Sequence, residues 1–371
     1  MSKVILGMSG GVDSSVTAYL LREQGYEVEG RSFILWKGES QSGPSACCSM
    51  KAVEEVSKTA HYIGINHSVI DVSNDFMEKV INIFINAYTN GLTPNPCILC
   101  NRFIKFPFLL GEAEKTGAEY ISTGHYAKVE KFNELNNPPP PPFRKGGIGG
   151  FKNSYFFLKK GVDAKKDQSY FLYVLRQEEL KRLILPLGYY RKDEVRKIAL
   201  ELNLPAVNRA ESQDICFIQG GNYSKLIEKL SSVTGKPGPI VDLNGKVIGT
   251  HKGVHKYTVG QRKRLGISSP EPLYVTRIDP LENIVYAGPC DAAKKKEFFV
   301  KDLLWIINPS SNKFRASVKV RSMMKEKPAT VFHVSDENVR VVFDVPQWAP
   351  APGESAVLYD DDIVVGGGII I

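Results

Sequence analysis

Apolar residues follow two patterns over the first 125 positions of the chain. Short apolar runs predict strands, at 3–6, 27–35, 66–72 and 120–123. Between them, apolar residues at helical spacing predict helices, at 14–24, 50–62, 74–89 and 103–116. Strands that alternate with helices at this spacing are typical of a parallel sheet covered by helices. The sequence therefore predicts an α/β domain at the start of the chain.

The pattern changes after this region. Residues 136–150 contain consecutive prolines and a glycine-rich tail, a low-complexity composition that favours an insertion outside the core. Two further helices are predicted, at 177–184 and 192–202. Beyond about residue 208, turn signals separate short β-rich runs, which is typical of small barrels, at 274–278, 316–320 and 338–343. We expect three domains: an α/β domain over 1–208, a small, mostly β central domain over 209–280 and a C-terminal β-barrel over 281–371.

Composition and charge narrow the class of protein. The 371 residues carry a formal net charge of +8, which favours an anionic partner such as nucleic acid. No apolar run is long enough to cross a membrane, and the N-terminal run is too short for a signal peptide, so we expect a cytoplasmic protein. In that compartment the six cysteines, which include two close pairs, indicate metal binding or sulfur chemistry rather than disulfides.

The most specific local motif is GMSGGVDSS at 7–15, between the first strand and the first helix. Its glycines expose backbone N–H groups at a helix N-terminus, which together form a site for phosphate. Asp13 either helps to hold magnesium on the phosphates or caps the helix. The motif lacks Walker and dinucleotide spacing, and it resembles the loop of the PP-loop ATP pyrophosphatases. That resemblance implies cleavage of ATP between its α- and β-phosphates.

Two cysteine motifs extend the resemblance. Cys97 and Cys100 follow Pro94 and Pro96, which predict an extended loop, and Cys216 lies in the run ESQDICFI. With further segments they resemble the tRNA-specific 2-thiouridylases over most of the chain, at 123–126, 166–170, 260–262 and 343–349. The resemblance implies that ATP adenylates O2 of a wobble uridine in tRNA and that sulfur then attacks C2. The products would be 2-thiouridine, AMP and pyrophosphate.

The resemblance also assigns roles to residues. Cys100 is the nucleophile and Cys216 carries a persulfide, which suits the strong nucleophilicity of ionised sulfur at neutral pH. The implied ATP site comprises Gly7, Met8, Ser9, Gly10, Gly11, Val12, Asp13, Ser14, Phe33 and Gly124. The target base would lie against Asn95, Pro96 and Cys97, and other tRNA contacts would come from His125, Lys166, Asp167, Gln168, Arg262, Arg321 and Gln347. The expected sulfur donor is a cysteine desulfurase or a sulfur-carrier protein.

Cys97 is a departure from the family, because a common version of the motif has aspartate there. It leaves two mechanisms open. Either Cys216 delivers sulfur as a persulfide, or Cys97, Cys100 and Cys216 hold three irons of a 4Fe–4S cluster whose fourth iron binds sulfide. Zinc suits these thiols less well, because they serve a reactive site. Cys290 is explained as a buried small residue, and Cys47 and Cys48 equally well as buried residues or as a thiolate site.

Basic residues cluster at 251–264, with Tyr257 among them, and at 313–327. Such runs are usually solvated faces, but two of them outside the ATP-binding domain favour contact with RNA phosphates. Two other functions stay open. One is a PP-loop synthetase for a small molecule, which would not need the cysteines. The other is a nucleic-acid-binding protein with a structural CxxC metal site and a decayed loop, although the loop is complete.

Overall fold

The computed structural model describes residues 1–36, 50–132, 155–207, 215–218, 222–233, 235–335 and 337–371. Its N-terminal part is built on the parallel sheet that the sequence predicts, with five strands in the order β3-β2-β1-β4-β7. These strands are β1 (Lys3–Gly7), β2 (Glu27–Ile34), β3 (Asn66–Asp71), β4 (Tyr120–Thr123) and β7 (Leu183–Ile184). The predicted insertion at 136–150 and the pair Cys47 and Cys48 lie outside the described residues.

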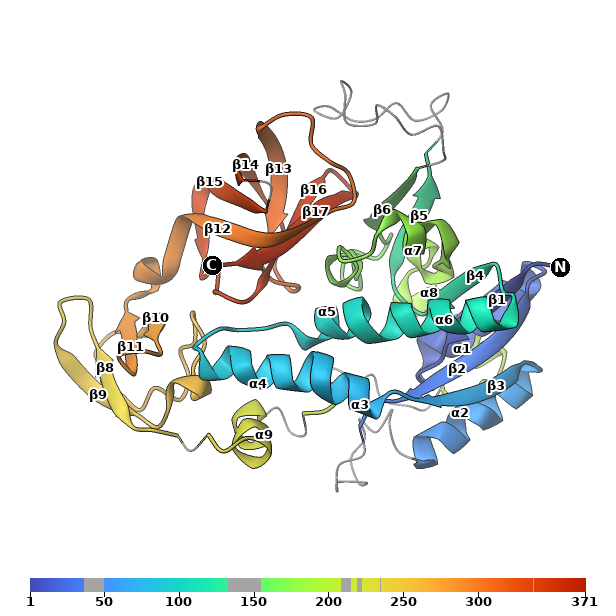
Figure 1. The fold of residues 1–371 in the computed structure, drawn as a ribbon, viewed down its shortest axis with the longest axis horizontal. Coiled ribbons are helices and arrows are strands. Elements are labelled where there is room, and N and C mark those ends of the chain that lie inside the picture. Colours follow the sequence, from blue (N-terminus) through green and yellow to red (C-terminus); the bar gives the residue numbers. More distant parts are fainter. Residues whose placement is uncertain (37–49, 133–154, 208–214, 219–221, 234, 336) are drawn as a thin grey trace.

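Helices cover both faces of this sheet (Figure 1). Successive side chains of β1 point to opposite faces, and all of its central residues are fully buried. Val4 and Leu6 pack in a cluster formed with α1 (Val12–Glu23), α2 (Met50–Ile63) and α8 (Lys192–Glu201). Ile5 packs in a second cluster, with α6 (Phe106–Thr116) and α7 (Gln177–Arg182). The predicted helix at 177–184 is too long, because Leu183 and Ile184 pair with β4 as β7.

Two long helical runs lie side by side next to the sheet (Figure 1). One comprises α3 (Ser73–Phe76), η1 (Met77–Ile81) and α4 (Asn82–Thr89), and the other comprises α5 (Pro96–Cys100), η2 (Asn101–Lys105) and α6, where η1 and η2 are π-helical turns. The prediction of an extended loop around Cys97 and Cys100 is therefore wrong. The side chain of Asn95 accepts a hydrogen bond from the backbone N–H of Ile98 (3.3 Å), and Pro96 at the first helical position needs no acceptor.

The central part combines a helix with a small mixed sheet of order β10-β11-β8-β9. Its elements are α9 (Tyr223–Leu230), which the sequence pattern does not predict, β8 (Gly238–Val241), β9 (Val247–His251), β10 (Tyr274–Asp279) and β11 (Ile284–Gly288). Short helical turns of the chain are η3 (Ser169–Phe171), η4 (Pro186–Tyr189), η6 (Val254–Lys256) and η7 (Cys290–Ala293). No described helix combines the length and the apolar character that a membrane crossing requires.

The C-terminal part is the predicted barrel. Its strands follow the order β12-β15-β14-β13-β16-β17, and a further pairing of β12 with β17 closes the ring. They are β12 (Lys294–Trp305), β13 (Lys313–Lys319), β14 (Lys327–Ser335), β15 (Asn338–Trp348), β16 (Ser355–Asp360) and β17 (Ile363–Ile370). An antiparallel hairpin of β5 (Ala127–Lys131) and β6 (Phe156–Lys160) joins the barrel sheet where Lys159 pairs with Ile363. The N-terminal part thus contributes two strands to the C-terminal sheet, which the sequence does not predict.

Buried polar contacts join the three parts. The hydroxyl of Tyr170, which is fully buried, donates to the backbone carbonyl of Ser355 in the barrel (2.8 Å). Arg321 of the barrel donates to the backbone carbonyl of Val259 in the central part (2.8 Å), and its Nε lies 3.3 Å from Glu354. Burial raises the pKa of Glu354 to about 7, although the charge of Arg321 opposes this shift.

Gly188 in η4 provides a test of this packing. A Cβ added there would overlap the backbone carbonyl of Ala127 at the start of the hairpin, and backbone cannot move aside as a flexible side chain can. We expect Gly188→Ala to lower the free energy of unfolding in urea by about 3 kcal/mol. Gly111→Ala is the matched control, because a Cβ there meets nothing within 4 Å inside α6. The control should gain about 0.5–1 kcal/mol, and equal effects of both substitutions would contradict the close approach.

Candidate active site

The glycine-rich loop lies where β1 ends and α1 begins, at the carboxyl edge of the parallel sheet. Gly10 has a φ of 76°, in the left-handed region that glycine adopts most easily. The hydroxyl of Ser14 accepts from the backbone N–H of Ser9 (3.3 Å) and donates to the carbonyl of Gly11 (3.1 Å), which holds the loop in shape. In the described structure no side chain caps the N-terminus of α1. That N-terminus therefore suits a phosphate.

Asp13, in the first turn of α1, is held by two donors. Its Oδ1 accepts from the hydroxyl of Tyr126 (2.7 Å) and from the ammonium group of Lys192 at the start of α8 (2.7 Å). The Lys192 side chain is only 9% exposed, and a buried charge needs such a partner. Asp13 is also the loop carboxylate that would contact magnesium on a bound nucleotide. Magnesium there would neutralise part of the phosphate charge.

The turn after β4 completes this edge of the sheet. Thr123 pairs with Gly7, so the two strands end together, and Gly124 follows directly. A Cβ at Gly124 would lie 3.0 Å from backbone atoms of Asp13 and Ser14, so only glycine fits here without displacement. Phe33 on β2 is half-buried and meets Phe108 edge-on, with ring centroids 6.4 Å apart. The residues that the resemblance assigns to ATP therefore follow or line the carboxyl ends of adjacent strands, where α/β sheets bind ligands.

The two cysteines of α5 differ in their surroundings. Cys97 is exposed and Cys100 is buried in a hydrophobic cluster with residues of α3, η1 and α4. Cys216 is half-buried and packs against the same cluster, although it lies far from Cys100 in the sequence. The neighbour of Cys216, Phe217, fixes that segment, because its ring meets Phe76 and Phe84 edge-on at 5.6 and 5.4 Å. The fold thus brings the predicted nucleophile and the predicted sulfur carrier to one cluster.

Cys97 is the third thiol of the predicted iron–sulfur ligand set. Among the described residues, no three His, Cys, Asp or Glu side chains are grouped so that they could hold a metal ion. Cys97 and Cys100 lie one turn apart on α5, but one faces solvent and the other the core. The described residues therefore show no grouping of Cys97, Cys100 and Cys216 around a single metal ion.

His125 follows Gly124 beside the ATP loop and contacts the helical run that begins with α5. Its Nδ1 shares a hydrogen bond with the hydroxyl of Thr123 (2.7 Å), and its ring stacks on Phe106 at 6.0 Å. Burial, and secondly the charge of Lys105, lower the pKa of His125 to about 3, so the imidazole is neutral at pH 7. The charge of Lys105 also acts on Cys97, where burial raises the pKa of the thiol and this charge opposes the shift. Lys105 therefore lies close enough to influence both groups.

Two residues of the predicted tRNA-contacting run also form hydrogen bonds within the protein. Asp167 is 6% exposed at its side chain and accepts from the backbone N–H groups of Gly161 and Ser169 (3.1 and 3.2 Å). Gln168 accepts from the backbone N–H of Tyr126 (3.0 Å) and so fixes the residue that contacts Asp13. In this structure both side chains position the turn beside the ATP loop. Lys166 is half-buried next to them.

The other residues predicted to contact tRNA differ in their surroundings: one is exposed, and two form hydrogen bonds within the protein. Arg262 is exposed, and Gln347 on β15 donates to the backbone carbonyl of Val345 (2.6 Å). Arg321 donates to the carbonyls of Val259 and Ala349 and pairs with Glu354, so its guanidinium group is used within the protein.

The two basic runs also differ from each other. In 313–327, Arg315 forms a two-bond pair with Asp344 (2.7 and 2.6 Å), and Lys319 is buried 4.0 Å from Asp167. Three cations of this run thus have acidic partners within the protein, counting Arg321 with Glu354, while Lys313, Lys325 and Lys327 are exposed. In 251–264, Tyr257 is buried and thus not available for base stacking. The exposed cations of that run are Lys252, Arg262, Lys263 and Arg264.

The sequence interpretation missed Lys192, the cation that joins α8 to the ATP loop. A signal for it exists in the sequence. Lysine in the first turn of a helix is unfavourable, because the helix dipole places partial positive charge there. Asp193 and Glu194, which follow Lys192, are residues that this position favours. A cation that opposes the local preference indicates a specific partner, which the structure identifies as Asp13.

A parallel sheet with a phosphate-binding loop after its first strand, and two thiols near its carboxyl edge, define an ATP-using enzyme of the PP-loop class. Residues 2–220 match the family described as tRNA methyl transferase HUP domain, 227–289 its PRC-barrel domain, and 295–370 an aminomethyltransferase beta-barrel domain. The chain belongs to the tRNA-specific 2-thiouridylase family. It is 43% identical over its full length to such a protein of Caldanaerobacter subterraneus subsp. tengcongensis, of which the match covers 98%.

A second relative of that name, from Clostridioides difficile, is 42% identical, with 99% of this chain and 98% of the relative covered. Among solved structures, a 4-thiouridine synthetase in complex with RNA and bound ATP is 16% identical, with a TM-score of 0.37. That likeness covers 62% of this chain and 50% of the synthetase. It is too distant to place ligands on this chain.

Cys97 provides a test of the site's electrostatics. Its thiol reaches solvent, yet the protein around it removes enough water to raise its pKa, and the charge of Lys105 opposes this shift. We expect the alkylation of Cys97 by iodoacetamide to have its midpoint above about pH 8.5, the value of an ordinary thiol. Lys105→Gln should move the midpoint higher still.

The measurement is mass spectrometry of the Cys97 peptide over a pH series, with the exposed Cys290 as the reference for reagent access. A midpoint below that of an ordinary thiol, or one unmoved by Lys105→Gln, would contradict this electrostatic account.

Proposed function

We propose that this chain is an ATP-dependent tRNA-uridine 2-sulfurtransferase that acts in the cytoplasm. The observation that carries the proposal is the placement of Cys100 and Cys216 at one hydrophobic cluster of the same N-terminal part that contains the ATP loop. Gly124 packs on Asp13, His125 follows it, and Lys105 influences both His125 and Cys97. Neither a methyl transfer nor a small-molecule synthetase requires two thiols at this place.

The first chemical step is the activation of the base. The oxygen O2 of the wobble uridine attacks the α-phosphorus of ATP, and pyrophosphate leaves. The backbone N–H groups at the start of α1 and the ammonium group of Lys192 stabilise the negative charge on the phosphates. This step converts O2, a poor leaving group, into part of AMP, a good one. It needs neither thiol.

The second step delivers sulfur. The terminal sulfur of a persulfide on Cys216 attacks C2, and the C2–O2 bond breaks so that AMP leaves. The Cys100 thiolate then attacks Sγ of Cys216, which releases 2-thiouridine and leaves a disulfide between the two cysteines. A thiol reductant must reduce this disulfide before the next turnover. We favour this route because it uses the two cysteines that the fold brings to one hydrophobic cluster.

Two partners follow from this chemistry. The persulfide has to be supplied to Cys216 by a cysteine desulfurase or by a sulfur-carrier protein. The target uridine has to leave the stack of the anticodon loop, since both its O2 and C2 must be reached. The exposed cations Lys252, Arg262 and Lys263 of the central part are the groups we assign to the tRNA backbone.

Substitution of the cysteines separates the two steps. We expect Cys100→Ser and Cys216→Ser each to abolish 2-thiouridine formation, measured by mass spectrometry of digested tRNA. Because adenylation requires no thiol, both variants should still release pyrophosphate when tRNA is added. Cys290→Ser is the control and should keep full activity, because Cys290 lies in η7, away from both motifs, and is exposed rather than buried as expected from the sequence.

Thiolation by Cys100→Ser would contradict the assigned chemistry. The same proteins, purified without oxygen, should contain far less than one cluster equivalent of iron. Near-stoichiometric iron that disappears in a Cys97→Ala variant would contradict the persulfide route and leave adenylation unaffected.

The tRNA surface has its own test. Combined replacement of Lys252, Arg262 and Lys263 by Ala removes three exposed charges, so we expect tRNA affinity to fall at least tenfold. The slope of log K against log salt should decrease by about 2–3, one for each lost phosphate contact. ATP binding should not change. Lys58→Ala, an exposed charge on α2, is the control. Unchanged tRNA affinity in the triple variant would exclude this surface.

A further inference from the structure

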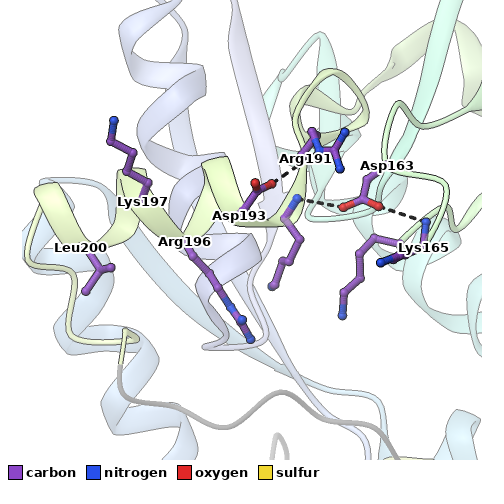
Figure 2. Close-up of a pocket in the computed structure, with 9 residues that line it drawn as sticks. Asp163, Lys165, Arg191, Asp193, Arg196, Lys197 and Leu200 are labelled. Atoms are coloured by element: carbon purple, nitrogen blue, oxygen red, sulfur yellow. Dashed lines mark hydrogen bonds and ion pairs between the residues drawn. The ribbon is translucent and has the colours of Figure 1, made fainter.

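The glycine-rich loop is fixed at its far end from α8. Asp13 accepts from the ammonium group of Lys192 (2.7 Å), and the backbone N–H of Lys192 donates in turn to Asp163 (3.0 Å). Figure 2 shows Asp163 close to the start of α8. The start of the loop, at Met8 directly after β1, depends on other contacts.

Met8 is held to β2 by both of its backbone groups. Its N–H donates to the carbonyl of Arg31 (2.8 Å), which continues the pairing of β1 with β2 by one residue. Its carbonyl accepts from the hydroxyl of Ser32 (2.8 Å), a residue that is only 3% exposed. A buried carbonyl without a donor costs free energy, and a serine hydroxyl has one hydrogen to give. The hydrogen of Ser32 is therefore committed to Met8.

The direction of the Met8 carbonyl also sets the direction of the next backbone N–H. In a trans peptide group the C=O and N–H bonds point to opposite sides. Because the Met8 carbonyl points to Ser32 on β2, the N–H of Ser9 points away from that strand, toward the hydroxyl of Ser14 in α1 (3.3 Å). The opposite orientation would place a carbonyl oxygen, with its partial negative charge, on the side where the loop presents N–H groups to a phosphate.

Ser32 is oriented in turn by His67 on β3. Nε2 of His67 lies 2.9 Å from Oγ of Ser32, and its Nδ1 lies 3.0 Å from Oγ of Ser57 on α2. Burial, and secondly the charge of Arg31, lower the pKa of His67, so the ring is neutral at pH 7 and carries one N–H. Because Ser32 has already used its hydrogen, this N–H is at Nε2. Nδ1 then accepts from the hydroxyl of Ser57.

The packing between β2 and β3 makes room for this chain of hydrogen bonds. Gly30 on β2 is the register partner of His67, and a Cβ there would lie 2.6 Å from Sδ of Met8 and 3.2 Å from Cδ2 of His67. Glycine at this position therefore lets both side chains lie against the strand. The three hydrogen bonds run in one direction, from Ser57 through His67 and Ser32 to Met8, and bonds in such a chain strengthen one another by polarisation.

We propose that Ser32 and His67 are positioning residues for ATP, which fix the Met8–Ser9 peptide group so that the loop turns N–H groups, and not a carbonyl, toward the phosphates. The inference rests on the proposed function, in which this loop holds ATP. Neither side chain has to touch the nucleotide, since both act through the backbone of Met8. Ser57 supports them from α2. Without its hydroxyl, Nδ1 can carry the hydrogen, and Nε2 then competes with Met8 for the hydrogen of Ser32.

The first measurement is the binding of ATP to the full-length protein, with magnesium and without tRNA, by isothermal titration. Ser32→Ala should bind ATP about three- to tenfold more weakly than wild type, the effect of one lost hydrogen bond. Ser57→Ala should bind more weakly than wild type but more tightly than Ser32→Ala. Alanine is favourable within a helix, so Ser57→Ala should unfold in urea no earlier than wild type. Ser68→Ala is the matched control, because Ser68 is exposed on β3 and neighbouring side chains of a strand point to opposite faces.

Two readouts separate this role from general support of the fold. In steady-state thiolation, Ser32→Ala should raise the KM for ATP and leave the KM for tRNA unchanged. Nitrogen NMR of protein with isotope-labelled histidine should show His67 protonated at Nε2 in wild type, and the form protonated at Nδ1 should appear in Ser57→Ala. An equal rise of both KM values, or a wild-type His67 protonated at Nδ1, would overturn the proposal.

Binding of ATP by Ser32→Ala as tight as by wild type would overturn it as well, and so would an equal weakening in Ser68→Ala. Absence of ATP binding in wild type would overturn both this inference and the proposed function. Wild type that binds ATP but does not thiolate tRNA would contradict the proposed function alone. ATP binding needs neither tRNA nor a thiol, so the comparison of the variants would still decide the role of Ser32 and His67.

Discussion

The parallel pairing of β1 with β4 is the constraint on which the site depends. It places Gly7 opposite Thr123, so that the loop after one strand and the turn after the other begin at the same level. The contact of Gly124 with the backbone of Asp13 follows from this register, and so does the reach of Tyr126 to the Asp13 carboxylate. A slip of one residue would turn every side chain of β4 to the opposite face. The glycine-rich loop would then lose its contacts with Gly124 and Tyr126.

The C-terminal barrel is bound to this same turn. The chain passes from the turn into the hairpin of β5 and β6, which continues the barrel sheet, and returns to place Gln168 under Tyr126. Tyr170 then enters the barrel core and donates to Ser355. The domains are therefore joined by shared sheet and buried hydrogen bonds rather than by a linker alone. Asp167 and Gln168, which the resemblance assigns to tRNA, form hydrogen bonds in this connection.

The sequence predicts the alternating α/β part and the barrel because their periodicities are local. It does not predict that α5 begins at Pro96, because proline is equally common at a helix start and in an extended loop, and the Asn95 cap decides. It does not predict the β5–β6 hairpin either, because a proline-rich segment separates the two short strands. The partners of the cations in 313–327 are also not predicted, because Asp344, which pairs with Arg315, and Glu354, which pairs with Arg321, are distant in the sequence and only the fold brings them close.

The hairpin of β5 and β6 fixes the two points at which the segment between its strands begins and ends. Pairing continues to the point where Phe132 donates to the carbonyl of Tyr155 (2.6 Å), so both ends of the intervening segment are fixed side by side. Closing a loop between fixed ends costs chain entropy that grows only with the logarithm of its length, about 0.6 kcal/mol for each doubling. Lengthening the chain at this position therefore costs little stability. The hairpin is thus a position at which evolution can add or remove sequence while the register of β4 and the loop it supports stay unchanged.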